Sequence, residues 1–230
     1  MRLLLAIAAC ALLAACGTTT STRMAAPTAI SAPAPNSKVL LMQPDVQLSL
    51  LTAAGLQEAR ADWSQQARTN ITQAIESELR AKSRPSELLD PTQAMAGREG
   101  QLIRLHEAVG QSIMAFNYGV INLPTKKGTF DWTLGEGTNV VREARGADYA
   151  LFVNGRGSYS SGGRKAMFIG MAALGVGIPL GGQTVFASLV DLRSGRVVWF
   201  NMATAGASDD MRTPEGARAL VGKLMTGAPL

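Results

Sequence analysis

The sequence predicts an α/β domain in which helices pack on a mixed β-sheet as a two-layer sandwich. Three observations predict this class: a short apolar run near residue 40, amphipathic helical stretches after it, and β-type segments followed by a last helix. This order is typical of α/β proteins because the apolar face of a sheet must be covered. The 230 residues are 47% hydrophobic and 17% charged, which is enough for one domain with a real core.

The first elements are a strand and a long helix. Residues 39–42 form a short apolar run that Pro44 ends, which predicts a buried strand. Asp62 and Gln65 fit a capping box at a helix start, and helical spacing of apolar residues continues to about Lys82. The predicted inward stripe is Trp63, Ala67, Ile71, Ala74, Ile75 and Leu79.

The middle of the chain predicts two more helices. Residues 84–97 are polar and interrupted by prolines, which favours a loop, and residues 118–123 fit a short strand. A helix is expected from residue 101 to about 114, and a short one over residues 139–145 that Gly146 ends. The first of these two helices should turn four side chains inward, namely Leu102, Leu105, Val109 and Ile113.

The last third of the chain is β-type up to its final helix. Residues 149–153 predict a strand that continues toward Tyr159, and residues 184–192 predict a second. Gly195 allows a tight turn, so residues 197–200 should pair back as a hairpin. Thr213 then precedes Pro214 and Glu215, the pattern of an N-cap, a first-turn proline and a first-turn acid.

The first residues of the chain form an export signal. Arg2 supplies a positive charge, and the thirteen residues from Leu3 to Ala15 are uncharged. As a helix they would extend about 20 Å, less than the roughly 30 Å of a bilayer core. The segment is therefore predicted to be a signal peptide and not a membrane span.

The signal ends in a string that resembles the bacterial lipobox, Leu13, Ala14, Ala15 and Cys16. The resemblance implies peptidase recognition of Leu13, Ala14 and Ala15, removal of residues 1–15, and a diacylglycerol and acyl group on Cys16. Cys10 also follows small residues, but it would leave a hydrophobic region below the usual 7–15 residues. A plain signal peptide with incidental cysteines is the other alternative.

The lipobox resemblance also implies a location and a domain organisation. Gly17 follows Cys16 where an aspartate would favour inner-membrane retention, so the implied place in a Gram-negative cell is the outer membrane, facing the periplasm. Residues 16–37 are rich in Ala, Pro, Ser and Thr, which predicts a flexible tether. Residues 38–228 are expected to form a single periplasmic domain. No cofactor is expected besides the lipid on Cys16.

The domain itself resembles a group of periplasmic lipoproteins that includes the curli-secretion channel lipoproteins and the activators of penicillin-binding proteins. The resemblance lies in the strand at residues 39–42, the amphipathic helix after it, the sequence from Gly146 to Tyr149, and the hairpin from Ser188 to Phe200. It implies a fold and a compartment, and it assigns no functional residue.

Few side chains suit catalysis. The two cysteines are assigned to the signal and the lipid, His106 is the single histidine, and no Gly-x-Ser-x-Gly elbow accompanies it. Gly155 and Gly157 begin a glycine pattern that Ser160 breaks, so nucleotide binding is not predicted. We therefore expect a non-enzymatic binding or assembly module; the alternative is an envelope-polymer-processing enzyme with His106 as base.

No metal site is predicted either. Three acids lie close together near the last helix, Asp209, Asp210 and Glu215. Such a group could in principle hold a cation, but three acids in a polar loop are more typical of a solvated turn. A pair of histidines, which a His-x-x-x-His site requires, does not exist in this chain.

The most unusual segment runs from Ala166 to Gly182, seventeen residues without a charge. Three interpretations are open: a buried segment that covers the sheet, a surface for a partner or a second copy, and a loop that touches a membrane. Glycines and Pro179 argue against a full membrane span. The residues predicted to make a partner or membrane contact are Phe168, Ile169, Leu174, Val176 and Ile178.

The charge of the chain bears on its partners. The formal net charge is +5, and loss of Arg2 with the signal leaves 5 − 1 = +4. A modest positive charge suits anionic lipid or peptidoglycan, whereas only 5% aromatic residues argue against nucleic acid. The expected partners are the membrane through the lipid, another envelope protein or peptidoglycan, and a second copy of the chain in a homo-oligomer.

Overall fold

A computed structural model describes residues 19–25, 34, 36–90, 92, 96–119, 121, 123–126, 129–206 and 208–230. The predictions for Cys16 and the signal peptide lie outside these residues. The strands are β1 (Thr19–Met24), β2 (Val39–Met42), β3 (Asp45–Leu51), β4 (Gln57–Ala59), β5 (Ser86–Leu89), β6 (Tyr149–Ser160), β7 (Gln183–Asp191) and β8 (Val197–Thr204). The helices are α2 (Ala61–Ala81), α4 (Arg98–Ile113), the π-helix η2 (Met114–Tyr118), α5 (Thr138–Arg145), α6 (Gly162–Ala173) and α7 (Pro214–Leu224).

All the strands belong to one mixed sheet, with the order β1-β8-β7-β6-β2-β5. Neighbours in the series β1, β8, β7 and β6 pair antiparallel. In contrast, β6 pairs parallel with β2 and β3, and β2 pairs parallel with β5. β2 and β3 lie end to end along β6. Leu41 lies opposite Leu151 and Asp45 opposite Asn154, with three residues between them on the β2–β3 side and two on β6, so one extra residue interrupts this ladder.

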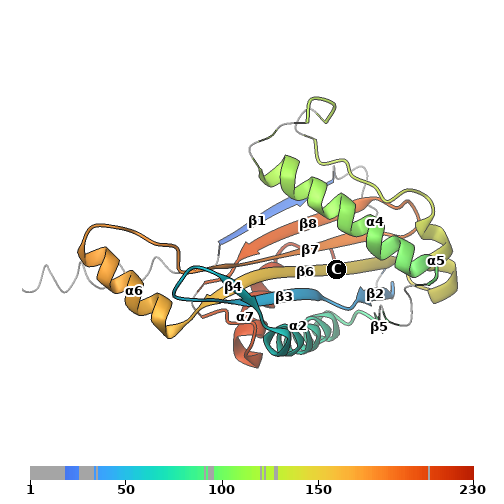
Figure 1. The fold of residues 1–230 in the computed structure, drawn as a ribbon. Helices are drawn as coiled ribbons and strands as arrows, with labels where there is room; N and C mark the ends of the chain where they lie inside the picture. Colours follow the sequence, from blue (N-terminus) through green and yellow to red (C-terminus); the bar gives the residue numbers. More distant parts are fainter. Residues whose placement is uncertain are drawn as a thin grey trace, which may run out of the picture.

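Helices cover both faces of this sheet. Figure 1 shows α4 and α5 on one side and α2 and α7 on the other. Successive residues of β2 therefore enter different cores: Val39 and Leu41 join the cluster with α2 and α7, and Leu40 joins the cluster with α4 and α5. The predicted α/β class with helices on a mixed sheet is confirmed. The predicted number of layers is corrected from two to three, because helices cover both faces of the sheet and every residue of β2 is buried.

The long helix α2 packs as its stripe predicts. Ala67, Ile71, Ala74, Ile75 and Leu79 are buried, and Trp63 packs at the edge of the same core. The predicted capping box is wrong, because Arg60 is the N-cap and lacks a side-chain cap. The Asp62 carboxylate accepts from the Arg60 guanidinium at 2.6 Å instead, within the first turn where the helix dipole favours an acid.

Two other predictions for the first half are corrected. Residues 86–89 of the predicted loop form β5, a short parallel edge strand that buries Leu89. Residues 114–118 form the π-helix η2, and the described residues among 119–123 are not in a strand. The first error arises because this edge strand buries only Leu89, so apolar periodicity does not report it.

The predicted tether is also partly a strand. Residues 19–24 form β1, which pairs antiparallel with β8 from Thr19 opposite Thr204 to Met24 opposite Trp199. Its side chains are nearly all exposed, so backbone hydrogen bonds to the edge of β8 hold it in place. The sheet therefore includes residues 19–24 of the segment that was predicted to be a tether.

The last elements follow their predicted signals. Gly195 has φ 72° in the β7–β8 turn, and Gly146 has φ 58° after α5. A side chain at either position would be strained in this left-handed conformation. The Thr213 side chain accepts from Gly216 N at 3.1 Å, with Pro214 at the first position of α7.

Asn201 connects β1, β8 and α7, and its replacement should be costly. The side chain is fully buried; Nδ2 donates to Leu224 O at 2.7 Å and Oδ1 accepts from Thr22 Oγ1 at 3.0 Å. Asn201→Ala leaves a buried carbonyl without its partner, so the free energy of unfolding should fall by about 2–3 kcal/mol in urea titrations. Gln101→Ala on the exposed face of α4 is the control, and equal effects would contradict this assignment.

Candidate functional site

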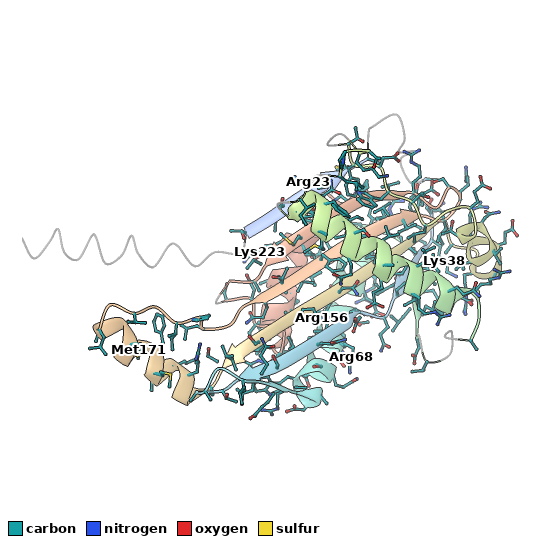
Figure 2. All side chains as sticks on the ribbon, turned by 45° about the horizontal axis from the view of Figure 1, so that its top comes forward. Arg23, Lys38, Arg68, Arg156, Met171 and Lys223 are labelled. Atoms are coloured by element: carbon teal, nitrogen blue, oxygen red, sulfur yellow. The ribbon has the colours of Figure 1, made fainter. Side chains whose placement is uncertain are left out.

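The uncharged segment predicted to be unusual is an arm that projects from one end of the sheet. We call residues 162–182, between β6 and β7, the arm; it consists of α6 and a returning loop. Figure 1 shows α6 beyond the end of the sheet, and Figure 2 shows Met171 far from Lys38, Arg68 and Arg156, which lie over the body of the domain. The interpretation that this segment is buried and covers the sheet is therefore wrong.

Local sequence explains the shape of the arm. The Ser161 side chain accepts from Arg164 N at 3.1 Å and starts α6. Gly175, with φ 77°, follows the helix, and Val176 N donates to Met171 O at 2.9 Å. Pro179 lies in the returning loop, where no helical hydrogen bond is needed. The arm is thus a capped helix with a defined return.

The apolar side chains of the arm are exposed. Leu174 is 77% exposed and Ile169 69% exposed, and Val176 is exposed as well. Phe168 and Ile178, the other predicted contact residues, are partly buried. Water around such side chains is unfavourable by about 25 cal/mol for each Å² of apolar surface. An exposed patch of this kind is typical of a surface that contacts another component.

Arg164 fixes the base of the arm to the domain. Its side chain is only 8% exposed; Nε donates to Pro179 O at 3.0 Å, and NH1 donates to Ala53 O at 3.4 Å. Ser158 N also donates to Gly182 O at 3.0 Å, and Ser160 Oγ donates to Leu180 O. The arm is therefore held at both ends, while the exposed part beyond has few contacts.

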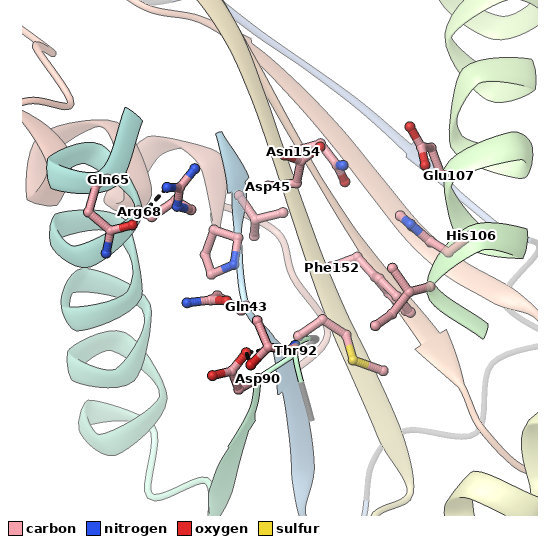
Figure 3. A pocket seen from close by; sticks show the side chains of 14 residues that line it. Gln43, Asp45, Gln65, Arg68, Asp90, Thr92, His106, Glu107, Phe152 and Asn154 are labelled. Carbon is pink, nitrogen blue, oxygen red and sulfur yellow. Dashed lines mark hydrogen bonds between the residues drawn. The ribbon is translucent and has the colours of Figure 1, made fainter. Parts of the chain in front are cut away.

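A polar cleft lies between α2 and α4, as Figure 3 shows. Its volume is about 490 Å³, within the usual size of ligand pockets. Arg68 donates to Val46 O at 3.1 Å and to Gln65 Oε1 at 2.7 Å, and Asp45 pairs with Arg156 at 2.5 Å. The cleft is lined by Met42, Gln43, Pro44, Asp45, Gln65, Arg68, Asp90, Thr92, Ile103, His106, Glu107, Phe152, Val153 and Asn154.

One carboxylate of the cleft is held in its ionised form. Asp90 accepts from Thr92 Oγ1 at 2.7 Å and from Thr92 N at 2.8 Å. These hydrogen bonds lower the pKa of the Asp90 carboxyl below its usual value. Arg68 and Asp45 are bonded to other groups of the protein as well, so these three charged side chains of the cleft are held in place, which is typical of a binding surface.

His106 lies in the wall of this cleft but is closed off from water. The prediction that Leu105 faces inward is wrong: Leu105 is exposed, and His106 is buried in its place. The imidazole stacks on Phe152 at 3.7 Å between ring centroids, and Nε2 lies 2.5 Å from the buried Ser188 Oγ. Burial lowers the pKa of His106 to about 3, so the ring is neutral at pH 7.

This environment does not favour catalysis by His106. A general base works best when its pKa lies near the operating pH, and the substrate must reach it within hydrogen-bond distance. The Nε2 atom instead contacts a hydroxyl that is itself without solvent access. We interpret the His106–Ser188 pair as a bond between α4 and β7 that satisfies two buried polar groups.

The buried histidine predicts a pH dependence of stability. Its pKa is about 6.5 when unfolded and about 3 when folded, so between these values the unfolded chain binds a proton that the folded chain does not. His106 should therefore lower the free energy of unfolding by about 1.4 kcal/mol per pH unit as the pH falls below 6. Urea titrations of wild type and His106→Gln at pH 7 and pH 5 measure this, and an identical pH effect in both would contradict it.

The acids near the last helix are paired. Asp209 is fully buried and accepts from Lys223 Nζ at 2.9 Å, and Asp210 pairs with Arg212 at 2.7 Å. The prediction of a solvated turn is corrected for Asp209, because the ion pair allows its burial. Among the residues that the structure describes, no group of three or more His, Cys, Asp or Glu side chains is placed to hold a metal ion.

Comparison with known proteins gives a distant similarity in fold. No family model matches the chain, and no curated protein sequence matches it. Solved structures that are similar to it include two of one protein. Both are dodecamers of PelC from Paraburkholderia phytofirmans, one of them a leucine-to-methionine variant. They are 13% and 14% identical to this chain, have TM-scores of 0.40 and 0.41, and cover 91% of it and 95% and 96% of their own chains.

The structure adds two residues to the site that the sequence did not indicate. Leu56, in the β3–β4 turn, is 67% exposed at the same end of the sheet as the arm. Arg164 is the second, one of two basic residues that directly precede the uncharged segment. A leucine directly after a turn glycine, Gly55, is a sequence signal for the first, whereas the role of Arg164 depends on contacts with Pro179 and Ala53, which are distant in the sequence.

Proposed function

We propose that this protein is a lipid-anchored, non-enzymatic contact module of the bacterial cell envelope. Acyl groups on Cys16 hold it to a membrane, and the arm binds a further envelope component. The exposure of the arm carries this proposal, because an uncharged segment from Ala166 to Gly182 that the domain leaves open is stable only against another surface. The anchor part of the proposal is supported by the lipobox resemblance at Leu13 to Cys16.

The non-enzymatic role is supported by the state of the polar groups. His106, the base of the alternative enzyme, is buried, neutral and bonded to Ser188. The cleft beside it is lined by hydrogen-bonded side chains, such as Arg68 and Asp90, that suit binding of a polar group. We therefore favour recognition over turnover for both the arm and the cleft.

The proposed location is the outer membrane of a Gram-negative cell, with the domain in the periplasm, because Gly17 follows Cys16. No helix of the part that the structure describes is long and apolar enough to cross a membrane. The candidate components for the arm are the bilayer, another envelope protein and a second copy of the chain. Nucleic acid is not among them, and peptidoglycan suits the polar cleft better than the apolar arm.

Site-specific photocrosslinking in intact envelopes tests the contact. A photoreactive amino acid replaces Ile169 in the arm or, as the control, Leu105, an exposed apolar residue of α4. We expect a strong adduct, to lipid or to protein, from position 169 and severalfold less from position 105. Equal yields at the two positions, or no adduct from the arm, would refute the arm as a contact site.

A further inference from the structure

Three segments that are far apart in the sequence meet at one end of the sheet. The arm leaves β6 at Ser160, which lies opposite Leu51 at the end of β3, so the β3–β4 turn lies beside the base of the arm. Arg164 NH1 donates to Ala53 O and joins the two directly. The start of β1 lies at this end as well, because Thr19 pairs with Thr204 and Thr204 with Thr184. We call this end, with residues 52–56, 162–182 and Thr19, the arm pole.

The arm pole concentrates exposed apolar side chains. Leu174, Ile169 and Leu56 are the three most exposed large hydrophobic residues among those that the structure describes, and all three lie here. The turn at residues 52–56 carries no charge, and neither do residues 166–182. Two separate segments thus expose apolar side chains at one end of the sheet, which is typical of a surface that contacts another apolar phase.

Beyond Lys165, the helix of the arm has no charged side chain and is apolar around its circumference. Met167 and Ile169 are two residues apart, which places them about 200° apart around the axis, and both are exposed. A helix that docks on one protein surface has an apolar stripe and a polar face, whereas a helix that is apolar all round is surrounded on every side. Lipid chains can surround it in this way, and this favours a bilayer over a flat protein surface.

The proposed lipid anchor is close to this pole along the chain. Cys16 precedes Thr19 by three residues, so its Cα atom is at most about 11 Å from that of Thr19 at the start of β1. Because β1 is part of the sheet and not a long tether, the acyl chains and the arm must enter the same membrane region. This step rests on the proposed acylation of Cys16.

We infer that the arm pole faces the bilayer and that the arm inserts into the leaflet that holds the acyl chains, with Leu56 beside it. The twelve residues of α6 extend about 18 Å, so the arm cannot cross the bilayer. The returning loop has backbone groups outside regular structure, which restricts it to the boundary between headgroups and acyl chains, about 5–10 Å deep. Lys165, exposed at the base of the arm, then lies level with anionic headgroups.

Fluorescence quenching at defined positions tests this orientation. The full chain carries Cys10→Ser, so that an introduced cysteine is the free thiol once Cys16 is acylated. The Cys10→Ser chain without an introduced cysteine measures the background labelling. Ile169→Cys and Leu56→Cys probe the pole, and Val140→Cys, exposed on α5 near the opposite end of β6, is the matched control. Each protein is labelled with a polarity-sensitive dye and reconstituted in vesicles of phosphatidylethanolamine and phosphatidylglycerol.

We expect lipids with a spin label on the acyl chain to quench the dye at positions 169 and 56, and aqueous iodide to quench it severalfold less there than at position 140. If position 169 is shielded from iodide but is not quenched by lipid, the arm contacts protein: the bilayer inference fails and the proposed contact function stands. If iodide reaches position 169 as readily as position 140, both fail. If quenching occurs only at high protein density in the vesicles, and crosslinks form between copies of the chain, the arm contacts a second copy. This outcome also overturns the inference.

Discussion

A chain with Cys16→Ser is expected to incorporate no palmitate and to be absent from the lipidated, processed membrane fraction. The hydroxyl of serine cannot form the thioether that the lipobox resemblance implies for Cys16. Two or three acyl chains anchor a protein stably, since each buried CH₂ contributes about 0.8 kcal/mol, so the loss of all of them is the largest single effect expected in this chain. Radiolabelled palmitate and fractionation of envelopes measure it.

Cys10→Ser is the matched control for this experiment, because it changes the other cysteine of the signal region. It should retain full labelling, since Cys10 is removed with residues 1–15. Labelling that depends on Cys10, or a Cys16→Ser chain that is fully processed and still membrane-bound, would contradict the assignment of the lipid to Cys16.

The double variant Ile169→Asp with Leu174→Asp is expected to abolish the arm contact without unfolding the domain. Both side chains are exposed, so the free energy of unfolding should change by no more than about 0.5 kcal/mol for each substitution. Burial of an Ile or Leu side chain against lipid or protein contributes about 1.5–3 kcal/mol, so the pair should weaken the contact by at least about 3 kcal/mol, roughly a hundredfold.

The yield of photocrosslinks from a probe at Val176, in the returning loop, measures this loss in envelopes. The control is Leu105→Asp with Val140→Asp, which adds the same charges at exposed apolar positions outside the arm pole. Undiminished crosslinking in the arm variant, or an equal loss in the control, would show that the exposed apolar residues of the arm do not make the contact.

Strong periodicity and local turn signals predicted several elements well. The stripe from Ala67 to Leu79 packs into the core, and Gly146 and Gly195 adopt the left-handed conformation expected of them. The N-cap at Thr213 is also as predicted. In these cases the interactions that determine the local structure join residues close in the sequence, so the local sequence pattern is sufficient to predict the element.

Predictions that depended on distant partners were less accurate. β1 and β5 are edge strands whose backbones bond to β8 and β2, and neither buries enough apolar surface to produce a pattern. His106 is inward and Leu105 outward because Ser188 and Phe152 of the sheet receive the imidazole. Hydrophobicity alone would place Leu105 in the core and His106 at the surface, and the structure shows the reverse.

The amino-acid sequence alone determined the chemical character of this protein: an α/β domain, a predicted export and lipid signal, few catalytic side chains, and an uncharged segment from Ala166 to Gly182. Only the tertiary structure decided where that segment lies, and it placed it outside the core beside the β3–β4 turn and the first residues of β1. The physical reason is that composition records which side chains water disfavours, whereas their burial depends on which surfaces remain available once the sheet and its two helical layers have formed.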